Sequence, residues 1–166
     1  FFKKNNLTKT DLKNLGLLSE RGNFLFKNRI IFPITNLRNE TVGFGGRALD
    51  DFGPKYINTA ESSIYRKNRS LYFTSEFLSD LKKKKFVILV EGYFDVIAFN
   101  KLGFNNVASP SGTALTVQQI NLLSRYTKEI YLCFDNDEAG DTATKRVLEI
   151  KNNQPSEINF FKLNLP

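Results

Sequence analysis

The sequence has 166 residues, 41% of them hydrophobic and 16 of them Phe, which is enough for one domain or two closely packed lobes with a buried core. No run of eighteen apolar residues is present, so we expect no transmembrane helix, and the sequence shows no signal-peptide pattern. A net charge of +7 suits a polyanionic partner. His is absent and Cys occurs once, which excludes a His general base, a zinc cluster and an intrachain disulfide.

The amino-terminal part of the chain predicts a small antiparallel sheet. Residues 7–18 predict a short helix that is capped by Thr8 or Thr10. Three runs of β-branched and aromatic residues predict strands at residues 24–26, 30–35 and 41–48. The polar turn at residues 36–40 makes the last two strands a hairpin, and Pro33 is expected at an edge or a bulge of that sheet.

A glycine cluster and a basic segment follow in this part of the chain. Gly43, Gly45 and Gly46 directly precede Arg47, where they permit either a bend in the sheet or a close approach of the backbone. Residues 55–69 are predicted to be irregular, and they mix basic with aromatic side chains. Such a mixture either neutralises phosphates and stacks bases or forms a solvated loop. The side chains concerned are Lys55, Tyr56, Tyr65, Arg66, Lys67 and Arg69, with Tyr72 just beyond them.

The rest of the chain alternates between strands and helices. A helix is predicted over residues 74–81, and the lysines at 82–85 are interpreted as its solvated end, which complements the helix dipole. The alternation from residue 86 onward predicts a compact parallel sheet with right-handed crossovers. Strands are predicted at residues 86–90, 106–108, 130–134 and 158–163, and helices at 93–102, 116–126 and 139–151. Thr116 and Gln119 are expected to form a capping box.

Two apolar strands of this sheet end abruptly in carboxylates. Glu91 directly follows the first, and Asp135 and Asp137 follow the second. Because ligands bind beyond the carboxyl ends of parallel strands, we expect these side chains to converge at one edge. Converging carboxylates are costly unless a cation lies between them. A hard divalent cation prefers oxygen ligands, so the sequence predicts a magnesium site at this edge.

Several of these residues have structural alternatives. Asp137 is also placed to cap the helix that follows it, and Asp95 to stabilise the amino end of its own helix. Gly112 and Thr113 either cradle a phosphate or turn the chain into the next helix. Cys133 lies in a predicted buried strand, where a reduced, structural thiol is expected.

An ordered set of segments resembles one known family. Three segments between residues 91 and 140, two acidic and one containing glycine, look like the toprim signature of bacterial DnaG-type DNA primase. Three segments between residues 43 and 72 are similar to the basic region of that family. The upstream segments are Gly43-Phe44-Gly45-Gly46-Arg47, Lys55-Tyr56-Ile57-Asn58 and Lys67-Asn68-Arg69-Ser70-Leu71-Tyr72. The toprim segments are Glu91-Gly92-Tyr93-Phe94-Asp95, Gly112-Thr113-Ala114-Leu115-Thr116 and Asp135-Asn136-Asp137-Glu138-Ala139-Gly140. Asn136 departs from the glycine that the family commonly has there, although Asn also tolerates a positive φ.

The resemblance implies an α/β fold and an enzyme. Residues 85–166 would form a toprim domain with a Rossmann-like βαβ parallel sheet, preceded at residues 1–84 by a basic α+β lobe with a small antiparallel sheet. The implied activity is the synthesis of RNA primers on single-stranded DNA by metal-dependent nucleotidyl transfer. The implied catalytic and metal-binding residues are Glu91, Asp135 and Asp137, with Asp95 near the metal. Those implied for nucleotide and DNA binding are Arg47, Lys55, Asn58 and Lys67, with Gly112 and Thr113 as a possible phosphate loop.

The resemblance also implies cofactors, partners and a location. The cofactor would be Mg²⁺, which Mn²⁺ can replace, and zinc is not expected in this chain. The partners would be a single-stranded DNA template, nucleoside triphosphates, the RNA primer and a replicative helicase, the last bound through a domain absent here. The location would be the bacterial cytoplasm, and no membrane partner is expected. The chain begins at Phe1 and ends at Pro166. We therefore expect a fragment that lacks the family's zinc-binding domain and a further acidic cluster, and that makes little or no primer.

Other functions were weighed against this one. A different toprim enzyme, such as a topoisomerase or a nuclease, would share Glu91, Asp135 and Asp137 but would not account for the basic upstream segments. A haloacid-dehalogenase-type phosphatase also uses an Asp-x-Asp motif, but there the motif follows the first strand of the domain. A non-catalytic nucleic-acid-binding module would keep its affinity when the carboxylates are removed.

Overall fold

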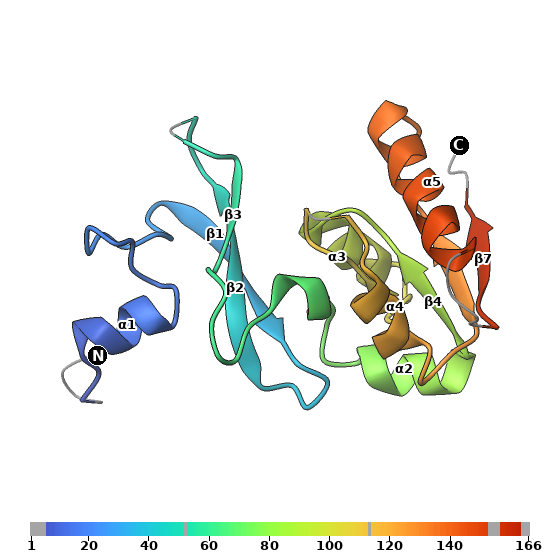
Figure 1. Cartoon of the computed structure of the whole chain (residues 1–166), viewed down its shortest axis with the longest axis horizontal. Helices are drawn as coiled ribbons and strands as arrows, with labels where there is room; N and C mark the ends of the chain where they lie inside the picture. The colour runs from blue at the N-terminus through green and yellow to red at the C-terminus, as the bar shows by residue number, and fades with distance from the viewer. Residues whose placement is uncertain (1–5, 52, 113, 153–156, 164–166) are drawn as a thin grey trace. The chain divides into compact units, whose positions relative to one another are not determined.

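A computed structural model describes residues 6–51, 53–112, 114–152 and 157–163, which fall into two compact units, Phe1–Arg66 and Lys67–Pro166 (Figure 1). The first unit contains an antiparallel sheet and the second a parallel sheet with helices. The predicted fold class, an α/β chain with an antiparallel amino-terminal lobe, is confirmed. The predicted domain boundary between residues 84 and 85 stays a prediction.

The first unit is built on a sheet with the strand order β1-β2-β3. β1 (Arg29–Thr35) and β2 (Thr41–Ala48) form the predicted hairpin, and β3 (Tyr56–Asn58) pairs with the far side of β2. β3 lies within the segment that was predicted to be irregular, so that prediction is wrong there. Pro33 lies in β1, which is an edge strand of this sheet, as expected.

The helix and the first predicted strand of this unit differ from expectation. The helix α1 (Lys9–Asn14) is shorter than predicted, because Leu15 caps it and Gly16 adopts a φ of +66°. Thr8 is its N-cap and forms a capping box with Asp11. No strand forms at residues 24–26, where only Phe24 makes an isolated bridge, to Leu18.

The glycines of β2 serve close packing. A Cβ at Gly43 would lie 3.1 Å from the ring of Tyr65, and one at Gly46 would lie 2.8 Å from the ring of Phe26. Both distances are shorter than ordinary van der Waals contact, so a side chain at either position would displace an aromatic ring. The structure thus shows close packing at Gly43 and Gly46, and a register shift between Ile34 and Thr35 also places an irregularity of the sheet beside Gly43.

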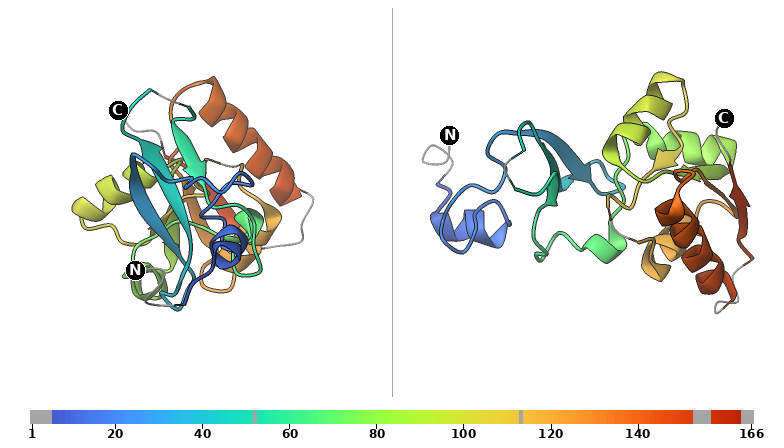
Figure 2. Two further views of the ribbon diagram at one scale, coloured as in Figure 1. Left: turned by 90° about the vertical axis from the view of Figure 1, so that its left-hand side faces the viewer. Right: turned by 90° about the horizontal axis from the view of Figure 1, so that it is seen from above.

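The second unit is a parallel sheet with the strand order β5-β4-β6-β7 and helices on both sides. The helices α2 and α3 lie on one side of it, and α4 and α5 lie on the other (Figure 2, right). In the central strand β4, residues 87–89 are buried, as its continuous apolar sequence predicts, whereas β6 buries Ile130 and Leu132 and leaves Glu129 and Tyr131 half-buried. The strands are β4 (Phe86–Leu89), β5 (Val107–Ala108), β6 (Glu129–Leu132) and β7 (Asn159–Lys162). The helices are α2 (Phe77–Lys84), α3 (Tyr93–Lys101), α4 (Val117–Leu123) and α5 (Glu138–Asn152).

The capping box of α4 also joins this helix to the start of the unit. Thr116 and Gln119 cap the helix reciprocally, as predicted. The Gln119 side chain is fully buried, and its Nε2 donates hydrogen bonds to the carbonyl oxygens of Ser70, at 2.6 Å, and Lys67, at 3.1 Å. A buried amide with all these partners fixes the segment at residues 67–70 against α4.

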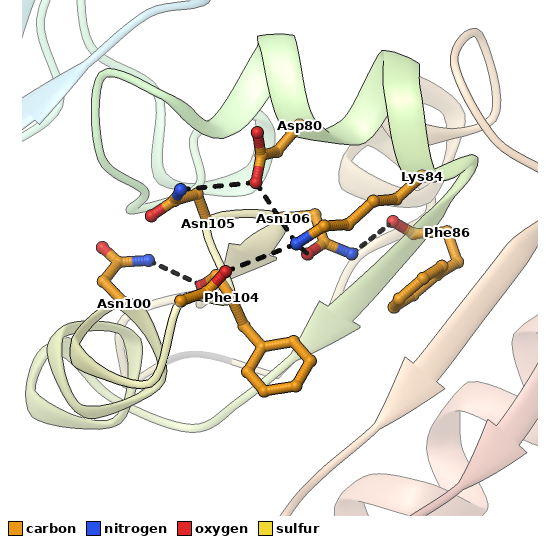
Figure 3. Close-up of polar contacts among 8 residues, drawn as sticks. Asp80, Lys84, Phe86, Asn100, Phe104, Asn105 and Asn106 are labelled. Carbon is orange, nitrogen blue, oxygen red and sulfur yellow. Dashed lines mark hydrogen bonds and ion pairs between the residues drawn. The ribbon is translucent and has the colours of Figure 1, made fainter.

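A polar network holds the end of α2 against the start of β4 (Figure 3). Lys84 Nζ lies 3.2 Å from Asp80 Oδ2, one turn earlier in the helix, and donates to Asn106 Oδ1 at 3.2 Å. Asn106 is fully buried, and its amide donates to the carbonyl oxygen of Phe86 at 2.9 Å. Asn105 donates to Asp80 at 3.3 Å. The lysine run is thus not a uniformly solvated helix end, because Lys84 joins α2 to the loop before β5.

This network predicts how stability depends on pH. The hydrogen bond from Lys84 holds the pKa of Asp80 below its ordinary value, and the nearby lysine charges lower it further. A lowered pKa contributes stability above the ordinary aspartate range, and that contribution is lost as the pH falls through the folded-state pKa. We expect Asp80→Asn to lower the free energy of unfolding at pH 7, with a difference from wild type that shrinks in acid.

Urea unfolding at pH 7 and at pH 3 measures this difference. Asp51→Asn is the matched control, because it removes one negative charge from an exposed position of the first unit. An Asp80→Asn variant whose difference from wild type is the same at both pH values would show that the ion pair contributes nothing.

Candidate active site

The register of β4 and β6 brings the predicted carboxylates together at one rim. Leu89 lies beside Leu132 in the parallel pair, and the ladder continues with Cys133 N–H donating to the Leu89 carbonyl oxygen at 2.8 Å. Beyond the last paired residues, the backbone N–H of Asp135 donates to Glu91 Oε1 at 3.0 Å. Glu91 and Asp135 are therefore in direct contact although 44 positions separate them.

Two of these acids, Glu91 and Asp95, have raised pKa values. Burial raises the pKa of Glu91 above the ordinary value, the hydrogen bond from the Asp135 backbone opposes this, and the charges of Asp135, Asp137 and Asp95 raise it further. The pKa of Asp95 is also raised, mainly by burial and further by Asp135, against a lowering by the Gly92 N–H. These shifts indicate a site of accumulated negative charge, which a bound cation would relieve.

Two of the acids also cap helices, as their structural alternatives proposed. Asp95 Oδ2 accepts a hydrogen bond from the backbone N–H of Gly92 at 2.9 Å, at the start of α3. Asp137 Oδ1 accepts one from the backbone N–H of Gly140 at 2.8 Å, at the start of α5. Each bond engages one carboxylate oxygen, and in the described chain the other oxygen of Asp137 accepts no hydrogen bond. Capping and ion binding are therefore compatible for Asp137.

The donor chemistry fits a hard divalent cation. Glu91, Asp135 and Asp137 offer only oxygen, and the charges of Asp135 and Asp137 add to the burial that raises the pKa of Glu91. Among the described residues, no three His, Cys, Asp or Glu side chains form a closed metal cluster. Mg²⁺ does not need one, because it is usually held by one or two carboxylates while waters and substrate phosphates complete its octahedron. The roles of these residues as metal ligands and catalysts stay predictions.

A cleft of about 730 Å³ opens at this rim within the second unit. Glu91 and Asp137 line it, and α5 forms one wall through Glu138, Thr142 and Arg146, which share one helix face because they are four residues apart. The opposite wall comes from the loop before α4, through Pro110, Gly112, Ala114 and Leu115. Sequence reasoning singled out neither Thr142 nor Arg146, since nothing in the spacing of a solvated helix marks the turn that faces a cleft.

The proposed phosphate loop is described only in part. Gly112 lines the cleft with a φ of +78°, which suits glycine, whereas Thr113 lies outside the described residues. The preceding Ser109 is fully buried, and its hydroxyl donates to the Glu91 carbonyl oxygen at 2.7 Å and accepts from the Ser111 N–H at 2.8 Å. Ser109 thus fixes the loop to the backbone of Glu91, which is half-buried, a role that its sequence context did not reveal.

Gly140 is a second residue whose role the sequence did not reveal. A Cβ at this position would collide with the backbone carbonyl oxygen of Asp135, so only glycine lets the acidic loop fold back onto the start of α5. Cys133 lies beside this loop and is buried, as expected. Burial raises the pKa of its thiol, and the charges of Asp95 and Asp135 raise it further, so it stays protonated.

The predicted basic residues are divided between the two units. Arg47 and Tyr56 are directly opposite each other on β2 and β3, with the guanidinium 5.6 Å from the ring centroid and a 3.3 Å hydrogen bond to the phenol oxygen. Lys55 is exposed and directly precedes β3, and Asn58 is half-buried at the end of β3. Lys67 begins the second unit. Whether these residues face the carboxylates stays a prediction.

Comparison with known proteins agrees with this geometry. Residues 1–78 match the family described as the DNA primase catalytic core, N-terminal domain, and residues 88–166 match the Toprim-like family. The DNA primase of Rickettsia bellii is 39% identical over 170 residues, which cover 98% of this chain and 28% of that protein. The DNA primase of Aquifex aeolicus is 41% identical over 152 residues, which cover 89% of this chain and 30% of that protein.

The chain belongs to the bacterial DnaG-type DNA primase family. The crystal structure of the Aquifex aeolicus primase, with its zinc-binding and RNA polymerase domains, superposes with a TM-score of 0.89 at 38% identity, covering 99% of this chain and 41% of that one. The structure of the DnaG primase catalytic domain bound to single-stranded DNA superposes with a TM-score of 0.86 at 32% identity, covering 99% of this chain and 54% of that one. The chain thus spans less than a third of the length of these two primases and part of each solved structure.

The close approach at Gly140 yields a test of the primase rim. A glycine-to-alanine change inside a helix normally stabilises a protein by about 0.5–1 kcal/mol. At Gly140 we expect the opposite, a loss of about 1–3 kcal/mol, because the new methyl group must push away the Asp135 carbonyl.

Urea unfolding of Gly140→Ala measures this loss, with Ser79→Ala on the exposed face of α2 as the control for helix propensity. Stabilisation by both substitutions would contradict the assigned role of Gly140.

Proposed function

We propose that this chain forms part of the catalytic core of a DNA primase, which synthesises RNA primers on single-stranded DNA by metal-dependent nucleotidyl transfer. The observation that carries the proposal is the contact between Glu91 and Asp135 at the carboxyl ends of β4 and β6, in a rim where Asp137 also lines the cleft. The membership of the chain in the DnaG-type family supports the same activity.

Magnesium is the proposed cofactor, and manganese would replace it. Glu91, Asp135 and Asp137 would hold the ion, with Asp95 supporting them from the start of α3. When bound, the ion would lower the pKa of the primer 3′-hydroxyl and neutralise charge on the leaving pyrophosphate. The chain's own contribution is to fix the positions of the acids. Ser109 donates a hydrogen bond to the Glu91 backbone, and Gly140, which has no side chain, lets the Asp135 carbonyl pack closely against the start of α5. Such positioning is a large part of what phosphoryl-transfer enzymes provide.

Nucleotide and template would be held by charge. Arg47, Lys55 and Lys67 would bind the triphosphate and the template backbone, with Asn58 as a hydrogen-bonding partner. Arg presents a planar, bidentate donor pair to phosphate, whereas each Lys acts as a mobile point charge. Arg146, which lines the same cleft as Glu91 and Asp137, adds a cation near the site of transfer.

The proposed partners follow from this activity. They are single-stranded DNA, nucleoside triphosphates, the RNA primer and, through a domain outside this chain, a replicative helicase; the proposed role implies the bacterial cytoplasm as the location. One solved relative is a DnaG catalytic domain bound to single-stranded DNA. Within the described part of the chain, no helix combines the length and the apolar character that crossing a bilayer requires.

The alternatives are less well supported. A topoisomerase or nuclease of the toprim class would account for the acidic rim, but not for the match of residues 1–78 to the amino-terminal domain of the primase core. A non-catalytic nucleic-acid-binding module would not require the desolvated Glu91, whose raised pKa costs free energy at neutral pH.

Primer synthesis tests the proposal. Because this chain spans under a third of the length of its relatives, the assay uses the Aquifex aeolicus primase, in which the segment that superposes on this chain is replaced by residues 1–166. We expect this chimera to make RNA primers on single-stranded DNA with Mg²⁺ or Mn²⁺. Glu91→Gln in the chimera should lower the rate at least about 100-fold, since metal catalysis contributes several kcal/mol to such reactions.

Glu149→Gln is the control, because it removes one acid from an exposed position of α5 that does not line the cleft. A chimera that binds single-stranded DNA and retains full activity with Glu91→Gln would overturn the proposed function.

A further inference from the structure

Basic residues from two distant segments meet at the amino end of the parallel sheet, away from the acidic rim. Phe86 and Glu129 are paired in the register of β4 and β6, so the residues that precede them, Lys85 and Lys128, begin neighbouring strands. A hydrogen bond from the Thr127 hydroxyl to the Lys85 carbonyl oxygen ties the two strand entrances together. The two segments are the end of α2 and the turn between α4 and β6.

A cavity of about 370 Å³ lies between these segments. Lys85, Arg125 and Lys128 line it, and Lys82 adds its ammonium 5.9 Å from the centroid of the Tyr126 ring, which also lines the cavity. We call Lys82, Lys85, Arg125 and Lys128 the amino-end patch.

The charge of the amino-end patch is poorly compensated. Lys85 and Arg125 form no ion pair with another residue in the described part of the chain. Lys128 is paired with Glu157 at 3.9 Å, but the Glu157 side chain is 90% exposed, and such a pair contributes little. Among the described residues, Glu129 is the one acid that lines the cavity, and its Oε2 accepts a hydrogen bond from the Tyr131 hydroxyl at 3.4 Å.

The lysines at residues 82–85 differ in what their side chains contact. Lys84 turns into the network with Asp80 and Asn106, where it joins α2 to the loop before β5. Lys82 and Lys85 instead turn toward the α4–β6 turn. Lysines at the end of α2 are enough to balance the dipole of that helix. The dipole therefore does not explain why Arg125 and Lys128, from another segment, lie at the same cavity.

We propose that the amino-end patch binds the phosphate backbone of a nucleic acid strand at a second surface, separate from the acidic rim. Lys85 directly precedes the four-residue strand β4 and Glu91 comes two positions after it, so six residue steps, about 20 Å of extended backbone, separate the two. The cations are exposed and spread over two segments, which suits a row of phosphates better than one enclosed phosphate group. Arg125 can grip a phosphate with two donors, and Tyr126 offers a ring against which a base can stack.

The test measures binding of a fluorescein-labelled 20-nucleotide oligo(dT) to the 166-residue chain by anisotropy, in EDTA and over a series of salt concentrations. The patch variant is Lys85→Asn, Arg125→Gln and Lys128→Gln; Asn is chosen because Lys85 has a φ of +63°, which Asn tolerates. The control variant is Lys9→Gln, Lys101→Gln and Lys145→Gln, which removes the same charge from exposed positions outside the patch.

We expect the patch variant to bind at least about fivefold more weakly at low salt and to lose about 2 from the slope of log affinity against log salt, since single strands release about 0.7 counterion per neutralised phosphate. The control variant should stay within about twofold of wild type. Equal affinities and slopes for the two variants would overturn the proposal.

Two further arms keep the result unambiguous. If ATP, added without divalent cation, lowers wild-type binding to the level of the patch variant, the site takes a free nucleotide and the proposal is wrong. Should the triple variant fail to fold, as judged by thermal unfolding, Arg125→Gln against Lys101→Gln repeats the comparison, with an expected slope change of about 0.7. Because no divalent cation is present, a negative result leaves the proposed primer synthesis untouched.

Discussion

The parallel register of β4 and β6 is the constraint on which the chemistry of this chain depends. It sets Leu89 beside Leu132 and thereby brings Glu91 to the backbone of Asp135 at one end of the sheet. The same register pairs Phe86 with Glu129 at the other end, and Lys85 and Lys128 directly precede these two residues. All strands of a parallel sheet run in the same direction, so the pairing of β4 with β6 gathers acids at the carboxyl ends of the strands and cations at their amino ends. The acidic edge suits a metal cation, and the basic edge suits phosphates.

The acidic edge is held at an energetic cost. Burial and three neighbouring acids raise the pKa of Glu91, so its ionised form is less stable in the fold than in water. The surrounding structure enforces the arrangement through buried groups: Ser109 fixes the Glu91 backbone, and the close path at Gly140 fixes the loop of Asp135. A cation bound at this edge offsets the cost, which couples ion binding to stability.

The sequence predicted those features that rest on local signals. Apolar runs ending in acids predicted the rim, and the spacing of Thr116 and Gln119 predicted a capping box, because each signal lies within a few residues. The strand β3 was missed because its pairing depends on β2 rather than on its own composition. The role of Gly140 was missed because the atom it must avoid belongs to a loop that reaches it only in the folded chain.

Thermal unfolding of wild type and Glu91→Gln, each in EDTA and in excess Mg²⁺, tests most directly whether the acidic edge is a strained cation site. Gln keeps the acceptor for the Asp135 N–H but removes the charge. The account predicts that in EDTA the variant has a Tm equal to or above that of wild type, and that Mg²⁺ raises the wild-type Tm more than that of the variant. A wild-type Tm that does not respond to Mg²⁺, together with a variant that is less stable in EDTA, would contradict it.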